Sequence, residues 1–261
     1  MIVAGCDGGS ATQKVIVTGS TTLMPIAEVA AEEYHKQHPE TDVLVSGMGS
    51  SAGIESVSNG SSDIGTSSRE LKDEELDLGL VDAPVAYDAI AVIVHPDNPV
   101  GELTTMEVRA IYAGVITNWS ELGGPDLEIG LVNRDEASGT REAFKKIVMD
   151  DAEFDRGAVV LPGTGQVRSV VADVPGAIGY ISLGFVNEDV RAVAIDDVEP
   201  SEDAVVAGTY PIQRTLHFFT LGDAQGATAD YIAYVLSPAV QDTIVRDAGF
   251  IPITAKEAVG G

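Results

Sequence analysis

The chain has 261 residues, of which 44 % are hydrophobic, and its 41 acidic residues outnumber 15 lysines and arginines to give a formal net charge of −26. This length allows one large domain or two of ordinary size. The acidic balance excludes a nucleic-acid binder, whose phosphate contacts need a basic surface. No apolar run approaches the roughly 18 residues that span a membrane. An acidic surface with only six lysines is typical of proteins from very salty habitats, where screening suppresses self-repulsion.

Strand and helix patterns alternate along the chain. Strands are predicted at 14–18, 41–46, 63–68, 89–94, 127–132, 176–181 and 215–220. Helices are predicted at 25–38, 52–59, 104–113, 139–149, 164–173, 225–237 and 239–248. This alternation predicts a parallel sheet covered by helices, with ligands at the carboxyl ends of the strands.

Two α/β lobes account most simply for these elements. Extended crossings are predicted near 85–90 and 208–215. They divide the chain into a discontinuous first lobe (13–88 plus 213–261) and a second lobe (89–212), preceded by a linker at 1–12.

The only cysteine, Cys6, ends the short run Val3-Ala4-Gly5-Cys6 and precedes a polar stretch. A single cysteine excludes an internal disulfide and a cysteine-based metal site. The run resembles the lipobox at the end of a lipoprotein signal peptide, which predicts lipid attachment at Cys6. The charged and long apolar regions of such a signal do not precede it, so an accidental match is the alternative.

Three clusters of small residues lie where a predicted strand runs into a helix. They are residues 19–22 (Gly-Ser-Thr-Thr), 49–51 (Gly-Ser-Ser) and 138–140 (Ser-Gly-Thr). Such turns direct hydroxyls and unpaired backbone N–H groups toward one point at the positive end of a helix dipole. Each cluster therefore indicates a site for an oxyanion.

Arg134 adds a cation to the third cluster, because it lies four residues before Ser138 at the end of a predicted strand. A guanidinium group donates bidentate, charge-assisted hydrogen bonds to an oxyanion, and Gly139 allows its backbone N–H to approach closely. The alternative is an ordinary N-capped helix with a surface arginine. Together, the three turns and Arg134 predict a cage for a small tetrahedral anion.

Two other motifs overlap the second cluster. Residues 49–53 satisfy the G-x-S-x-G nucleophile elbow with Ser51 as nucleophile, but none of the four histidines lies in a suitable late loop. Residues 47–52 match the dinucleotide fingerprint, whose acidic ribose anchor could only be Asp63, at the wrong end of its strand. No phosphate-binding P-loop and no His/carboxylate pair at metal-ligand spacing occurs, so neither nucleotide hydrolysis nor a catalytic metal is expected.

Five motifs in order resemble the phosphate-binding subunits of ABC phosphate importers, from about residue 13 to residue 253. They occupy 19–27, 49–54, 63–69, 116–119 and 134–141. The resemblance implies a type II periplasmic-binding fold, in which two lobes close on a ligand by a hinge.

The resemblance also implies which residues bind phosphate, namely Ser20, Thr21, Thr22, Ser50, Ser67, Ser68, Arg134, Ser138, Gly139 and Thr140. It implies an exported, cell-surface binding protein without catalytic activity or cofactor, which delivers inorganic phosphate to the membrane permease and is anchored through Cys6. A protein that reports phosphate status to a sensor is a further alternative.

One position departs from several members of this family. Ser68 stands where they carry an aspartate that accepts the proton of phosphate and repels sulfate. Asp63, Asp135 or Glu136 could supply the missing acceptor. Sulfate, molybdate or tungstate therefore remain alternative ligands, although some members carry serine here.

Overall fold

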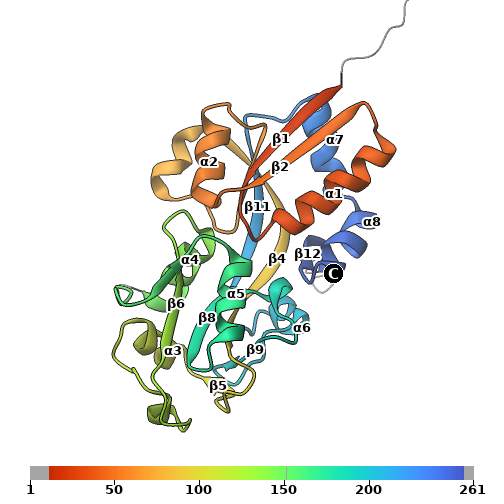
Figure 1. Cartoon of the computed structure of the whole chain (residues 1–261). Helices are drawn as coiled ribbons and strands as arrows, with labels where there is room; N and C mark the ends of the chain where they lie inside the picture. Colours follow the sequence, from red (N-terminus) through yellow and green to blue (C-terminus); the bar gives the residue numbers. More distant parts are fainter. Residues whose placement is uncertain (1–11, 151, 256–261) are drawn as a thin grey trace, which may run out of the picture.

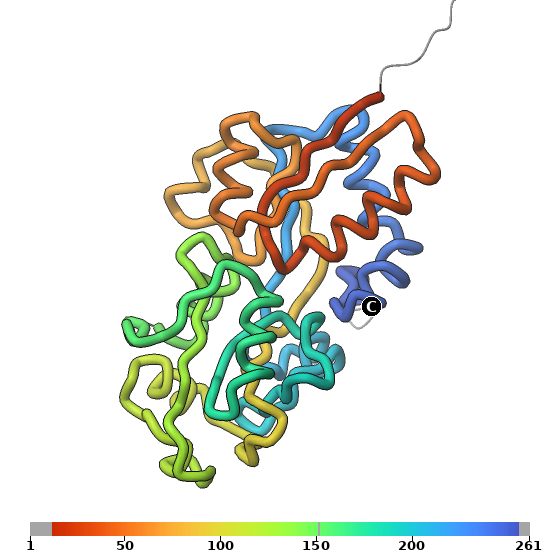
Figure 2. Tube along the Cα trace, in the orientation of Figure 1, coloured from red at the N-terminus to blue at the C-terminus, as the bar shows by residue number. Residues whose placement is uncertain are grey.

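The computed structural model describes residues 12–150 and 152–255, and shows two α/β lobes joined by two long strands (Figures 1 and 2). Cys6 and the predicted lipobox lie outside the described residues. No described helix combines the length and the apolarity needed to cross a bilayer.

The first lobe is built on a mixed sheet. Strands β2 (Thr41–Gly47), β1 (Gln13–Gly19) and β3 (Ile64–Ser67) run parallel, and β11 (Gln213–Leu221) pairs antiparallel with β3. The helices of this lobe are α1 (Met24–Gln37), α2 (Ser50–Ser58), α7 (Gly226–Val235) and α8 (Pro238–Val240), the last continued by a π-helical turn, Gln241–Val245. Pro25 lies in the first turn of α1, where its missing N–H has no intrahelical partner to lose.

Strand β4 (Leu80–Val94) runs through both lobes (Figure 1). Its first part pairs antiparallel with β11, and its last five residues pair antiparallel with β8 (Ala177–Ser182). The uninterrupted apolar run from Ala89 to Val94 is completely buried, because helices and loops of the second lobe cover both faces of the strand there. The strand is therefore the continuous connection between the lobes.

The second lobe extends this sheet with two further strands. β6 (Gly130–Arg134) runs parallel to β8 and to the short edge strand β7 (Val159–Leu161). The helices are α3 (Thr105–Tyr112), α4 (Gly139–Phe144), its π-helical continuation Lys145–Met149, α5 (Thr164–Asp173) and α6 (Glu202–Val206). The remaining strands are the two-residue segments β5 (Glu102–Leu103), β9 (Arg191–Ala192), β10 (Ala194–Ile195) and β12 (Ile251–Pro252).

Separate hydrophobic cores lie in the two lobes. The first-lobe core packs β1 and α1 against β11 and α7, with Phe218 and Tyr231 among its largest side chains. The largest core of the second lobe surrounds Phe144 and Tyr180, whose rings stack 4.0 Å apart. This separation supports the lobe boundaries at 88/89 and 212/213, which we retain as our proposal.

The prediction of a parallel sheet is wrong for the strands that join the lobes. β11 is antiparallel to both neighbours, and β4 is antiparallel to β8. These strands pass straight between the lobes instead of returning through a helix, so the chain does not form a simple βαβ succession. The sequence also did not predict β7, α6 or the part of β4 before residue 85, and the predicted start of β6 is three residues too early.

Candidate functional site

The N-terminal ends of four helices meet between the lobes. Helices α1 and α2 come from the first lobe, and α4 and α5 come from the second (Figure 1). The backbone N–H groups of each first turn have no intrahelical acceptor, and each helix dipole presents its positive end. Three of these four helix starts were predicted as oxyanion turns. The fourth, at Thr164, was not.

A small polar cavity lies at this meeting point. It is lined by Ser20, Thr21, Thr22, Gly49, Ser50, Ser68, Arg134, Ser138, Gly139 and Thr140. These side chains leave almost no water-sized space between them, so the cavity has no room for a drug-sized ligand and suits only a small ion. Every polar side chain in the lining carries a hydroxyl or a guanidinium group, and no carboxylate is among them.

Arg134 is the cation of this cavity and is 2 % exposed. Its guanidinium group donates to the carbonyl oxygens of Leu161 and Pro162 and to the hydroxyls of Thr164 and Thr21. All four acceptors are neutral, and no carboxylate of the described residues lies within 4 Å of it. Burial lowers the pKa of Arg134, but arginine remains charged in proteins. The side chain thus brings to the cavity a positive charge that no described carboxylate contacts.

Thr164 holds this arginine in position. Its Oγ1 lies 3.1 Å from Arg134 Nη1, 3.2 Å from Thr21 Oγ1 and 3.4 Å from Thr22 Oγ1. Because Thr164 begins α5 in the second lobe and both other threonines belong to the first, its hydroxyl joins the lobes. The sequence signal was present in the Gly163-Thr164 pair at a helix start.

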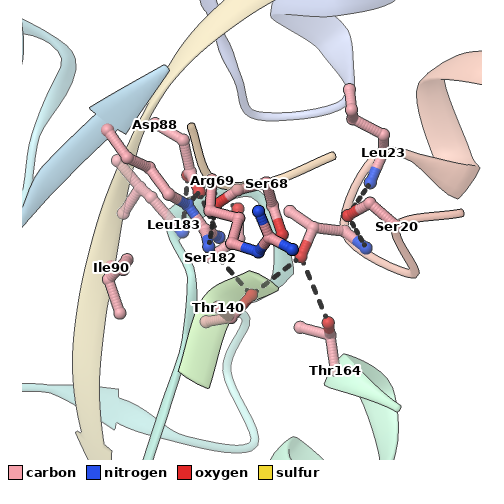
Figure 3. A network of polar contacts seen from close by, with 12 residues as sticks. Ser20, Leu23, Ser68, Arg69, Asp88, Ile90, Thr140, Thr164, Ser182 and Leu183 are labelled. Carbon is pink, nitrogen blue, oxygen red and sulfur yellow. Dashed lines mark hydrogen bonds and ion pairs between the residues drawn. The ribbon is translucent and has the colours of Figure 1, made fainter. Parts of the chain in front are cut away.

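A second arginine, Arg214 on β11, contacts the lining residues Ser68 and Thr140, which Figure 3 labels together with Asp88. It forms a bidentate ion pair with Asp88 on β4, at 2.9 and 2.8 Å. Its Nη1 also donates to the carbonyl oxygen of Ser68 and to Oγ1 of Thr140, at 3.0 and 2.9 Å. Burial raises the pKa of Asp88, and Arg214 and a hydrogen bond from Ser182 oppose this and favour the carboxylate. The pair is electrically neutral, so Arg134 remains the net charge at the cavity.

The lobes touch closely beside the cavity. Gly49 has φ +95°, and a side chain there would approach the carbonyl oxygen of Ala137 to 2.7 Å. A side chain at Gly139 would lie 2.3 Å from Ser50 Oγ. Hydrogen bonds also join the lobes. The N–H of Ser51 donates to the carbonyl oxygen of Ala137, and the hydroxyl of Thr22 is hydrogen-bonded to the hydroxyl of Thr140. The structure therefore shows the two lobes closed on each other.

Nine of the ten residues predicted to bind the anion line the cavity, and Ser67 is the exception. Its hydroxyl donates to the carbonyl oxygen of Arg69 and accepts from the Arg69 N–H, so it shapes the turn after Ser68. The hydroxyls of Ser50 and Ser68 lie 3.2 Å apart, and Ser50 Oγ also accepts from the Ser68 N–H.

None of the three carboxylates considered as an acceptor lines the cavity. Asp63 accepts from the N–H of Ile16, and Glu136 is exposed. Asp135 has a buried carboxylate oxygen without a hydrogen-bond partner among the described residues, but Asp135 is not one of the residues that line the cavity.

The serine-hydrolase alternative finds no support in the geometry. Ser51 Oγ accepts from Arg69 at 3.3 Å. All four histidines are described, and each faces a carboxylate or a backbone group rather than Ser51. The second lobe also contains a larger hollow, which is lined mainly by apolar side chains such as Leu127 and Val159. It lies apart from the converging helix ends, and no described lysine or arginine lines it.

Comparison with known proteins identifies the family. The model of the PBP superfamily domain matches residues 7–239. The phosphate-binding protein PstS of Bacillus subtilis (strain 168) is 38 % identical over 247 residues, which cover 94 % of this chain and 82 % of that protein. This chain belongs to the PstS family of phosphate-binding proteins.

Solved structures agree with this assignment. A structure from Clostridium perfringens, described as a phosphate ABC transporter substrate-binding protein with bound phosphate, superposes with a TM-score of 0.89 at 38 % identity. The match covers 92 % of this chain and all of that one. An ABC-type phosphate transport receptor from Vibrio cholerae gives a TM-score of 0.77 at 33 % identity, covering 91 % of this chain and 99 % of that one. The type II periplasmic-binding fold is thereby confirmed, and members of this family are binding proteins rather than enzymes.

Proposed function

We propose that this chain binds inorganic phosphate in the cavity between its lobes and delivers it to the membrane permease of an ABC importer. The observation that carries the proposal is Arg134, a buried guanidinium group without a carboxylate partner that faces hydroxyls and four helix N-termini. A buried charge is costly unless it is paired. The paired group must be a small anion, because the lining side chains leave almost no free space between them. The relatives named for phosphate binding support phosphate as that anion.

The chemistry of binding follows from this arrangement. Arg134 supplies charge, and the hydroxyls of Ser20, Thr22, Ser138 and Thr140 supply donors that rotate to suit the ligand oxygens. Free N–H groups at the helix starts complete the shell. Because the donors come from both lobes, a bound anion favours the closed state over an open one. No proton is transferred and no bond is broken.

Isothermal titration with phosphate tests the proposal directly. We expect Arg134→Ala to weaken binding more than any other single substitution. A truncated buried charge pair costs about 2–5 kcal/mol, which is roughly 30-fold or more in affinity. Arg156→Ala is the matched control, because it also removes one positive charge but from an exposed position. If Arg134→Ala bound phosphate within a few-fold of the parent protein, the site assignment would be wrong.

The same titration separates phosphate from the other oxyanions. Sulfate and molybdate are added as competitors at a fixed phosphate concentration. If sulfate or molybdate displaced phosphate preferentially, that anion would be the ligand, and the assignment of the cavity as the binding site would still hold.

We also propose a lipid anchor at Cys6 and a saline habitat. The run Val3-Ala4-Gly5-Cys6 supports the anchor, and the net charge of −26 supports the habitat. Expression of the full precursor in a bacterial host with labelled palmitate tests the anchor. Label should enter the parent protein and be absent from Cys6→Ser.

A further inference from the structure

A second cluster of ionisable groups lies in the first lobe, outside the phosphate cavity. It consists of His217 on β11, Asp82 on β4 and Glu70 in the loop after β3. The imidazole side chain is 3 % exposed, whereas the carboxylates are 41 % exposed at Asp82 and 63 % exposed at Glu70. None of the three residues lines the cavity. The cluster thus has a buried nitrogen base and an acidic side that is open to solvent.

The contacts fix the proton on one nitrogen of the ring. Nδ1 of His217 lies 2.8 Å from Oδ1 of Asp82, and a carboxylate can only accept, so Nδ1 carries a hydrogen. Nε2 is buried and has no hydrogen-bond partner among the described residues. Oε1 of Glu70 lies 3.2 Å from Nε2 but outside hydrogen-bond alignment. A neutral imidazole would therefore direct its lone pair toward the region of a carboxylate, which requires a cation between or beside them.

We propose that Nε2 of His217 and the carboxylate of Glu70 ligate a divalent transition-metal ion such as Zn²⁺. If both ligand atoms are about 2.1 Å from the ion, their separation of 3.2 Å gives an angle of about 100° at the metal. That angle is close to tetrahedral. Oε1 of Glu70 does not lie along the lone-pair direction of Nε2, which prevents a hydrogen bond between them. This position suits two atoms that are neighbouring ligands of one metal ion.

Asp82 completes the arrangement as a positioning residue. A carboxylate that accepts from the second ring nitrogen orients a ligating histidine and raises its basicity. The donor set favours zinc-like ions, because imidazole with carboxylate suits zinc, nickel or copper, while magnesium and calcium prefer oxygen ligands alone. The exposed carboxylates provide the entry path, and water fills the remaining positions.

Titration of the phosphate-free, full-length protein with ZnCl₂ tests this site. Excess Mg²⁺ in the buffer suppresses loose binding to the many surface carboxylates. We expect saturable binding of one Zn²⁺ that is lost in His217→Gln and Glu70→Gln. Asp82→Ala should weaken it about 10- to 100-fold. His95→Gln is the matched control, because His95 also lies near an aspartate, at 3.9 Å from Asp97.

Phosphate titration in the absence of metal checks that each variant is folded, since none of these residues lines the cavity. Should His217→Gln fail this check, the exposed positions Glu70 and Asp82 decide the question alone. Equal zinc affinity in parent and variants, or no saturable binding in the parent, overturns the proposal. So does a doubly protonated His217 ring, seen by nitrogen NMR at pH 7.5, that zinc leaves unchanged. In that case the cation is a proton.

Discussion

Nη1 of Arg214 lies 2.9 Å from Oγ1 of Thr140, so a residue of a strand that joins the lobes contacts a hydroxyl that lines the cavity. Because the guanidinium group can only donate, it occupies an acceptor position of Thr140 and leaves that hydroxyl hydrogen free to donate. Arg214 donates from the same nitrogen to the carbonyl oxygen of Ser68. It therefore positions one residue from each lobe without being part of the lining.

Arg214→Lys should weaken phosphate binding about 2- to 10-fold, the worth of one hydrogen bond of about 0.5–1.5 kcal/mol. Lysine keeps the charge opposite Asp88 but cannot reproduce the planar fork that also reaches Thr140. The measurement is a double-mutant cycle with Thr140→Val, read out by phosphate titration. The effect of Arg214→Lys should shrink in the Thr140→Val background.

Arg191→Lys provides the comparison for this cycle. Arg191 also donates to backbone carbonyl oxygens, those of Asn98 and Val100, but it lies away from the cavity. An equal loss of phosphate affinity in Arg191→Lys would show that Arg214 acts only through general stability.

Most of the cavity could be predicted from the sequence, because its parts are local. A hydroxyl at a helix start has the same orientation wherever the helix packs, so the turns that contain Thr22, Ser50 and Thr140 were identified from the sequence, and the family resemblance named these residues. Arg214 and Asp88 could not be found in this way, since they are 126 residues apart and meet only through the pairing of β4 with β11. That pairing depends on the two strands that pass between the lobes, where the expectation of a parallel sheet failed. Ser67 was predicted to bind the anion but does not line the cavity. A hydroxyl at a strand end can instead form hydrogen bonds with the nearby backbone, as Ser67 does with Arg69.

Glu75→Gln should destabilise the protein at neutral pH but not at low pH. Glu75 forms a bidentate pair with Arg69, the residue that follows Ser68, at 2.6 and 2.8 Å. Burial raises the pKa of Glu75, but the hydrogen bonds and charge of Arg69 and the N–H of Lys72 outweigh this and lower it overall. A lowered pKa means that the stabilisation is present above the unfolded value of about 4.3 and is lost as pH falls through the folded value.

Urea unfolding at pH 7, 5 and 3.5 measures this effect. Removing one partner of a buried pair costs about 3–5 kcal/mol, and we expect the lower end because the Glu75 side chain is 14 % exposed. Glu74→Gln is the control, since its side chain is exposed in the same helical turn. A stability difference that persisted undiminished at pH 3.5 would rule out the ion pair as its source.

Salt should stabilise the fold. A net charge of −26 causes repulsion within the compact state, and the Debye length falls from about 30 Å at 0.01 M to about 3 Å at 1 M salt. The thermal midpoint should therefore rise markedly from dilute buffer to molar NaCl. The rise should be smaller at pH 5 than at pH 7, because the charge diminishes toward the isoelectric point near 4.2. A midpoint that is flat or falls with salt at pH 7 would remove the argument for a saline habitat.

Ser68 decides how the cavity responds to the protonation of its ligand. With no carboxylate in the lining, the Ser68 hydroxyl can donate to an unprotonated oxygen or accept from a protonated one. Phosphate affinity should then vary little between about pH 6 and 8, the range in which inorganic phosphate loses its second proton. Ser68→Asp introduces an acceptor that needs the ligand proton. Binding in that variant should weaken as pH rises, because two negative groups then face each other without a shared proton.

Competition with sulfate, which carries no proton at these pH values, completes this comparison. Ser68→Asp should discriminate against sulfate more strongly than the parent protein, while Ser68→Asn, which is similar in size but uncharged, should not. Titrations of the three proteins at pH 6, 7 and 8 give both results. If the parent protein already rejected sulfate and lost phosphate affinity with rising pH, an acceptor other than Ser68 would be responsible. Asp135 would then be the residue to substitute, because its buried oxygen has no hydrogen-bond partner among the described residues.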